Sequence, residues 1–289
     1  MTSQVAVEKE QVANTIPFTP RPALLIKVQR LIADSIEFTW PDTQENFVPS
    51  STDARWESQV RADTTGAEIL MQLGLHSVTT PATGNCQYYA VAMSLLDLDF
   101  DTVQHVEALE QLTRHLKEGI AEATRHGYEV EFPHDIRQTI LVSTQLDVGD
   151  EELMIPETEE ESNWLFQEYI RDIAHSPSTT STYLPVELWG TEVTLRMMAK
   201  LLHQPIFVVI APYGLQTTID FQVYRPERVI KSGVEIDSAE QYYIPSSQYK
   251  KWFAQLQHAN VKGNAPVVLL FSNSHYSRLQ FAELPKDRS

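Results

Sequence analysis

The chain has 289 residues and a net charge of −17 at neutral pH, and this acidic balance argues against nucleic-acid binding, which requires clustered basic side chains. A hydrophobic content of 42% is sufficient for a globular core. The single cysteine excludes an internal disulfide framework and any cysteine-cluster zinc site, and the longest apolar run is shorter than the ~18 residues of a membrane span, so we expect no membrane contact.

The first 58 residues are expected to precede the main domain as an extension. They do not start with a basic segment followed by an apolar run, so we expect no secretory signal. Together with the single cysteine, this favours the cytoplasm, or the cytosol of a host cell. Residues 1–20 are expected to be a mobile lead-in, apolar spacing predicts one amphipathic helix over about residues 21–38, and residues 40–58 are polar and rich in turn formers.

Residues 59–289 are predicted to form one domain that begins with helices. The segment GAEILMQLGL predicts a short helix that ends near Gly74. Residues 87–96 are apolar on nearly all sides, which predicts a helix buried through the middle of the domain. Residues 103–126 predict an amphipathic helix. Its apolar stripe consists of Val106, Leu109, Leu112, Leu116 and Ile120.

Residues 127–180 are expected to be a variable, acidic insertion. Residues 147–161 carry eight acidic side chains and predict a solvated loop. Residues 163–174 predict a helix, and SPSTTSTYLP predicts a loop by its Ser, Thr and Pro content.

The last third of the chain changes to strands. TEVTLRMMAKLLH predicts a helix with Thr191 as its N-cap, and PIFVVIA predicts a buried strand directly after it. FQVYRP, QYYIP, PVVLLF and YSRLQF predict further strands. Helices packed on a small sheet form an α+β (α/β-like) domain, with the helix that follows the cysteine near its centre.

Cys86 stands at the start of the buried helix, directly after Gly84 and Asn85. The free N–H groups of a first helical turn and the helix dipole favour the thiolate, which is the nucleophilic form. A glycine-containing loop can also direct backbone N–H groups at an oxyanion. These are the requirements of a cysteine hydrolase, and the structural alternative is that Cys86 is a small buried hydrophobic residue.

A cysteine nucleophile needs an imidazole as its partner. Among the nine histidines, His275 differs because it joins two strand-like runs that would hold it rigidly, with Tyr276 beside it. We therefore expect His275 to be the partner of Cys86, the alternative being a structural histidine at a strand end.

Three separated segments together resemble the ovarian-tumour (OTU) family of cysteine proteases. TGNCQYYAVA is similar to the family's nucleophile motif, usually Asp-Gly-Asn-Cys before an aromatic-containing helix. LWGTEVTLRMMAKLLHQPIFVV resembles its Trp-Gly segment, helix and Pro-Ile strand, and NSHYSRLQF resembles its terminal histidine strand. The order of the three segments agrees as well, and the resemblance covers about residues 66–282.

The resemblance implies a papain-like fold and a deubiquitinase that cleaves the bond after the carboxyl-terminal glycine of ubiquitin or a ubiquitin-like modifier. Cys86 would attack the carbonyl, His275 would move the proton, and neither a metal nor a cofactor would be needed. The other implied site residues are the oxyanion loop of Thr83, Gly84 and Asn85, and the walls of the channel for the Gly-Gly tail, Trp189 and Tyr276. The alternative for both aromatic residues is plain core packing.

Two positions depart from the family. An Asp is usual three residues before the cysteine, where this chain has Thr83, and an Asp or Asn is usual two residues after the histidine, where it has Ser277. Strand alternation is expected to put residues 273, 275 and 277 on one face, so Asn273 or Ser277 could orient the ring. An upstream acid, Asp53 or Asp63, is the other possibility.

Two other functions stay open beside the deubiquitinase. The departures from the family fit a catalytically weak or inactive ubiquitin-binding module, and the same fold would also suit a viral or mobile-element protease that cleaves its own polyprotein. Ubiquitin presents an apolar patch ringed by basic side chains, which an acidic surface would complement.

Overall fold

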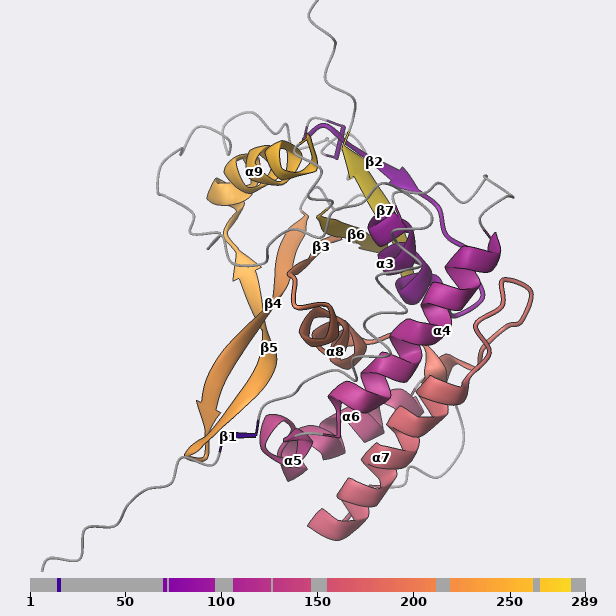
Figure 1. The fold of residues 1–289 in the computed structure, drawn as a ribbon, viewed down its shortest axis with the longest axis vertical. Coiled ribbons are helices and arrows are strands. Elements are labelled where there is room, and N and C mark those ends of the chain that lie inside the picture. The colour runs from indigo at the N-terminus through magenta and orange to yellow at the C-terminus, as the bar shows by residue number, and fades with distance from the viewer. Residues whose placement is uncertain are drawn as a thin grey trace, which may run out of the picture.

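The computed structural model describes residues 15–16, 70–71, 73–96, 106–125, 127–146, 155–211, 219–261 and 266–281. Within these ranges one seven-stranded sheet, in the order β1-β5-β4-β3-β6-β7-β2, is flanked by the helices α3 to α9 (Figure 1). This confirms the predicted α+β class with a small central sheet flanked by helices. The helix predicted over about residues 21–38, as well as Asp53 and Asp63, lies outside the described residues.

The strands form a mixed sheet. They are β1 (Thr15–Ile16), β2 (Leu75–Val78), β3 (Ile206–Ile210), β4 (Asp220–Lys231), β5 (Val234–Ile244), β6 (Val267–Ser272) and β7 (His275–Phe281). The pairs β3–β6 and β1–β5 are parallel, and the other neighbours are antiparallel. Two-residue turns join β4 to β5 and β6 to β7, and the residues of both turns have positive φ, as a type I′ hairpin requires.

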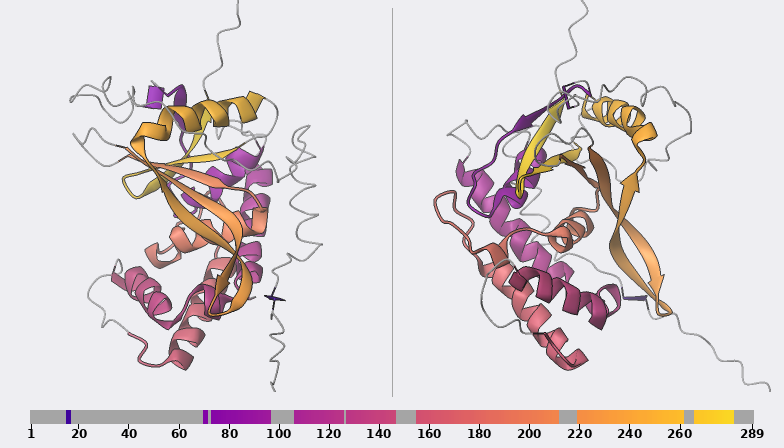
Figure 2. Two further views of the ribbon diagram at one scale, coloured as in Figure 1. Left: turned by 90° about the vertical axis from the view of Figure 1, so that its left-hand side faces the viewer. Right: turned by 180° about the vertical axis from the view of Figure 1, so that it is seen from behind.

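The helices gather mainly on one side of the sheet (Figures 1 and 2). They are α3 (Cys86–Leu96), α4 (Val106–Ala123), α5 (Tyr128–Glu131), α6 (His134–Leu146), α7 (Glu159–His175), α8 (Glu192–Leu202) and α9 (Tyr249–Val261). α4 contacts α3, α7 and α8, while α3 contacts β6 and β7. The helix that begins with Cys86 therefore lies between the other helices and the sheet.

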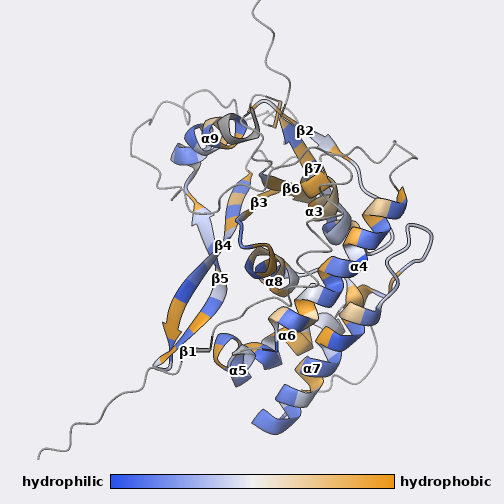
Figure 3. Cartoon of the chain, viewed as in Figure 1, coloured by the Kyte–Doolittle hydropathy of each residue, from blue (hydrophilic) through white to orange (hydrophobic). Residues whose placement is uncertain are grey.

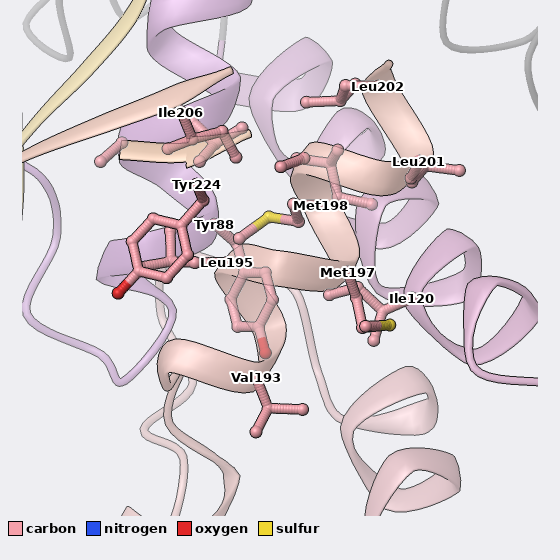
Figure 4. Close-up of a cluster of buried hydrophobic side chains, with 14 of the residues drawn as sticks. Tyr88, Ile120, Val193, Leu195, Met197, Met198, Leu201, Leu202, Ile206 and Tyr224 are labelled. Atoms are coloured by element: carbon pink, nitrogen blue, oxygen red, sulfur yellow. The ribbon is translucent and has the colours of Figure 1, made fainter. Parts of the chain in front are cut away.

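The sheet separates two hydrophobic clusters. In β3, Ile206 and Val208 belong to one cluster and Phe207 and Val209 to the other, as the alternation of a pleated strand dictates. The first cluster joins α3, α4 and α8 to the sheet (Figure 4), and α9 contributes to the second. All 11 residues of α3 are buried, which confirms the prediction made from its lack of a polar face; Figure 3 contrasts its hydrophobic colour with the mixed colours of α4 and α7.

The prediction of a loop over residues 147–161 is wrong for its last three residues. α7 begins at Glu159, so the last three residues of that stretch form a first helical turn. The hydroxyl of Thr158 accepts a hydrogen bond from the N–H of Glu161 at 3.1 Å, and carboxylates in a first turn are stabilised by the helix dipole. Residues 147–154 lie outside the described part of the chain.

Candidate active site

The loop that leads to Cys86 is fixed by Gly84 and Trp189. Gly84 has a φ of +86°, and a Cβ atom there would lie 2.5 Å from Nε1 of Trp189, so only glycine fits. The indole Nε1 donates to the Leu184 carbonyl at 3.0 Å, and the Leu184 N–H donates to the Thr83 carbonyl at 2.8 Å. Trp189 thus supports the loop before Cys86 through packing and hydrogen bonding.

Cys86 is the first residue of α3 and its side chain is 5% exposed. Burial raises the pKa of its thiol, while the backbone N–H groups of Tyr276, Gln87 and Cys86 itself favour the thiolate. The N–H groups expected at a helix start are therefore present, but desolvation outweighs them. The resting thiol is protonated at neutral pH.

His275 opens β7 directly after the hairpin turn. Because α3 packs against β7 and the backbone N–H of Tyr276 interacts with the sulfur of Cys86, the start of β7, where His275 stands, lies next to the start of α3. The imidazole is half-buried, and burial lowers its pKa, with a hydrogen bond to the Thr80 backbone acting in the opposite direction. The resting site therefore holds a neutral thiol and a neutral imidazole at neutral pH.

A side chain that the sequence did not single out contacts this imidazole. Oγ1 of Thr80 lies 3.2 Å from Nε2 of His275 and 2.6 Å from the carbonyl oxygen of Tyr276. Thr80 is 3% exposed. The family pattern has an acid or an amide as the orienting residue, and a threonine before a proline carries no signal of its own, so only the fold reveals this contact.

The predicted orienting residues lie at different places in the hairpin. Asn273 is exposed and occupies the turn, with a φ of 56°, so the expected alternation from residue 273 to residue 277 does not extend to it. Ser277 is inside β7, where it pairs with Leu270 and is buried. The catalytic roles of Asn273 and Ser277 stay predictions.

Two other predicted site residues, Asn85 and Tyr276, are buried and hydrogen-bonded or packed in the interior. Asn85 is fully buried and its Nδ2 donates to the Pro177 carbonyl at 3.0 Å. The ring of Tyr276 packs on Phe271 with 4.6 Å between centroids, and burial raises its pKa to about 12. Tyr276 lies at the site with its backbone N–H and with its hydroxyl, which forms a hydrogen bond with the side chain of Gln87, and its predicted role in a substrate channel stays a prediction.

A separate cleft of ≈ 710 Å³ lies at α5, α8 and the turn between β4 and β5, and neither Cys86 nor His275 lines it. Its charged lining consists of Glu129, Glu131, Glu159, Glu240, Arg196 and Lys231. Among the described side chains no group of three or more His, Cys, Asp or Glu could hold a metal ion. Of the helices described, none has the length and apolar character to cross a membrane.

Solved structures similar to this chain come from viral OTU proteases, the family whose motifs the sequence resembles. The OTU protease of Dera Ghazi Khan virus is 15% identical with a TM-score of 0.33, covering 72% of this chain and 82% of that one. The Hazara virus OTU bound to ubiquitin is 13% identical with a TM-score of 0.31, covering 73% and 83%. No family model and no curated protein matches the chain. At these scores the likeness by itself assigns neither activity nor substrate to this chain.

Proposed function

We propose that the protein is a cysteine-dependent deubiquitinase that hydrolyses the bond after the carboxyl-terminal glycine of ubiquitin or a ubiquitin-like modifier. The observation that carries the proposal is that Cys86 interacts with the backbone of β7 one residue after His275. The sulfur interacts with the N–H of Tyr276, and the neighbouring residue is His275.

The reaction starts from a neutral pair. His275 accepts the proton of the thiol while Sγ of Cys86 bonds to the glycine carbonyl carbon, and the carbonyl π electrons move to its oxygen. Backbone N–H groups at the start of α3 and in the preceding loop stabilise this oxyanion. The carbon–nitrogen bond then breaks, and the amine leaves with the proton from the imidazolium. Water, deprotonated by His275, hydrolyses the remaining thioester.

Ubiquitin as the substrate is supported by the three ordered motifs and by the net charge of −17, which suits a partner with a basic rim. The small exposed fraction of Cys86 adds a steric argument. Since its side chain is 5% exposed, a substrate must approach along a narrow path, and two consecutive glycines form the thinnest peptide that could do so.

A ubiquitin probe with a carboxyl-terminal electrophile tests this function. We expect one covalent adduct, which peptide mapping places on Cys86, and no adduct with Cys86→Ala. Because proton transfer by a positioned base contributes about 10²–10⁴-fold, His275→Ala should slow ubiquitin hydrolysis about 10³-fold. Thr79→Val, at an exposed position of the same loop, is the matched control and should behave as the wild type.

An inactive ubiquitin-binding module is the second candidate, favoured by the absence of an acid at Thr83 and Ser277 and by the raised pKa of Cys86. It predicts that ubiquitin binds without forming an adduct or being released from a conjugate. Full activity of His275→Ala would contradict the proposed mechanism.

A further inference from the structure

We propose that Thr80 is the positioning residue of the catalytic imidazole. Its hydroxyl oxygen accepts the Nε2–H of His275, beside the hydrogen bond of the ring to the Thr80 backbone, and the tautomer selected in this way offers an unprotonated Nδ1 as the base for Cys86. The chemical role of the imidazole rests on the proposed function, whereas the hydrogen bond itself does not. The hydroxyl then takes the orienting place that the resemblance led us to expect for an acid or an amide.

The direction of this hydrogen bond follows from counting protons. A threonine hydroxyl has one hydrogen, and a backbone carbonyl can only accept. Oγ1 of Thr80 is 2.6 Å from the carbonyl of Tyr276 and therefore donates its hydrogen there. In the contact of 3.2 Å between Oγ1 and Nε2 of His275, the hydroxyl oxygen must then be the acceptor and the Nε2–H of the ring the donor. This arrangement selects the tautomer with the proton on Nε2.

The position of Thr80 is set by the edge of the sheet. β2 pairs with β7 in a register that places Val78 opposite Arg278, and continuing that antiparallel register by two residues brings Thr80 opposite Tyr276. Pro81 follows and restricts Thr80 to extended backbone. Because Thr80 is also 3% exposed, its hydroxyl is held beside the imidazole without competition from bulk water.

A neutral acceptor matches the electrostatics of the site. A carboxylate in this place would stabilise an imidazolium through its charge, but a hydroxyl stabilises the ring mainly through orientation. Burial lowers the pKa of His275, so the imidazole is neutral before the reaction. Thr80 thus fits a mechanism in which the proton moves only as the sulfur attacks.

The test compares Thr80→Val, which lacks the hydroxyl, with Thr80→Ser, which keeps it, and with Thr79→Val as the exposed neighbour. We expect Thr80→Val to lower kcat for ubiquitin hydrolysis about tenfold or more, since one hydrogen bond amounts to about one decade in rate. KM should stay unchanged because the buried hydroxyl does not reach the substrate. Thr80→Ser and Thr79→Val should keep kcat within about twofold, well below one decade.

A readout independent of ubiquitin is the ¹⁵N spectrum of the His275 ring, assigned by its loss in His275→Ala. We expect the Nε2–H signal to be protected from exchange in the wild type and in Thr80→Ser, and to exchange rapidly in Thr80→Val. The pKa of His275 should also fall in Thr80→Val, because the hydroxyl acceptor stabilises the protonated ring and this substitution removes it. A purely structural role would change the melting temperature but leave these ring properties in place.

The outcomes separate this inference from the proposed function. If the wild type cleaves ubiquitin and a folded Thr80→Val has unchanged kcat and ring spectra, the role of Thr80 is overturned while the function stands. If the wild type neither cleaves ubiquitin nor reacts with the ubiquitin probe, the proposed function is contradicted. The ring spectra alone then test whether Thr80 accepts the hydrogen bond of His275. Should Thr80→Val not fold, Thr80→Ala removes the hydroxyl without adding a methyl group and gives the same comparison.

Discussion

At the scale of single residues, Cys86 and His275 rest as a neutral pair because both are desolvated. Burial raises the pKa of the thiol and lowers the pKa of the imidazole, and each shift disfavours the charged form. A thiolate–imidazolium pair would require charge stabilisation that exceeds this cost. The proposed reaction would therefore depend on a well-placed base rather than on a preformed thiolate.

This neutral pair predicts the pH dependence of alkylation. Because the pKa of Cys86 is raised above its ordinary value of 9.0, the rate of reaction with iodoacetamide should climb continuously from pH 6 through pH 9. The chain has one cysteine, so mass spectrometry of the whole protein reports Cys86 alone. His275→Ala should show the same profile, with glutathione as the reference thiol. A plateau that begins below pH 7 in the wild type and disappears in His275→Ala would instead show a resting ion pair.

At the scale of secondary-structure elements, the sequence predicts those whose buried side chains are mainly apolar. α3, α4, α8 and β3 agree with the predicted segments, because apolar residues carry most of their periodicity although α4 also buries Lys117 and α8 also buries Lys200. α6 was not predicted. Its core-facing positions include Arg137, which is fully buried and donates to the Phe132 carbonyl, while Ile136 is exposed. A charged residue at a core position removes the pattern on which such a prediction depends.

Another set of charges at core positions joins α5, α8 and β5. Oε2 of Glu131 lies 3.0 Å from Nζ of Lys200, and its Oε1 accepts from the hydroxyl of Ser238 at 2.7 Å. Both charged side chains are almost completely buried. Such a pair adds little net stability when complete, but losing Lys200 leaves the buried carboxylate of Glu131 with the longer ion pair to Arg196 at 3.8 Å.

Lys200→Met should therefore lower the free energy of unfolding by about 3–5 kcal/mol, measured by urea denaturation. The matched control is Lys231→Met, because Lys231 pairs with Glu240 at 2.8 Å while both side chains are about 30% exposed, and a pair of this kind contributes about 0–1 kcal/mol. Adding Glu131→Gln to Lys200→Met should recover part of the loss. Equal losses of unfolding free energy in Lys200→Met and Lys231→Met would contradict the distinction between the buried and the partly exposed ion pair.

At the scale of the whole molecule, the candidate site joins segments that are distant in sequence. Residues 80–86 precede and begin α3, residues 177–189 follow α7, and residues 275–276 open β7. The sequence predicts Cys86 and His275 because each lies in a recognisable motif. Thr80 and Pro177 have no such motif, and their roles depend on the β2–β7 register and on the path of the loop after α7. Tertiary contacts of this kind are absent from local patterns.

The loop after α7 connects α3 and the residue before it to α4. The Pro177 carbonyl accepts from Nδ2 of Asn85 and from Nζ of Lys117, both at 3.0 Å. The Ser178 carbonyl accepts from the hydroxyl of Tyr89 at 2.8 Å. Nζ of Lys117 also donates to Oγ of Ser176 at 2.8 Å and lies 5.1 Å from the centroid of the Tyr88 ring. Lys117 thus lies at a junction of α3, α4 and this loop.

The burial of Lys117 predicts how the stability of the molecule changes with pH. Burial lowers the pKa of Lys117 from 10.5 to about 7, so between these values the unfolded chain binds more protons than the native protein. The free energy of unfolding must then rise with pH, by up to about 1.4 kcal/mol per pH unit. The thiol of Cys86 acts in the opposite direction as the pH approaches 9, since burial raises its pKa above 9.0 in the native protein alone.

Urea denaturation of the wild type and of Lys117→Met at pH 7.0, 7.8 and 8.5 measures this effect, since the difference between the two proteins cancels the groups they share. We expect the wild type to gain stability relative to Lys117→Met as the pH rises. A difference that stays constant would mean that Lys117 remains protonated in the native protein. The carbonyl and hydroxyl oxygens of Ser176 and Pro177 would then hold it as an ammonium group, stabilised by the face of the Tyr88 ring.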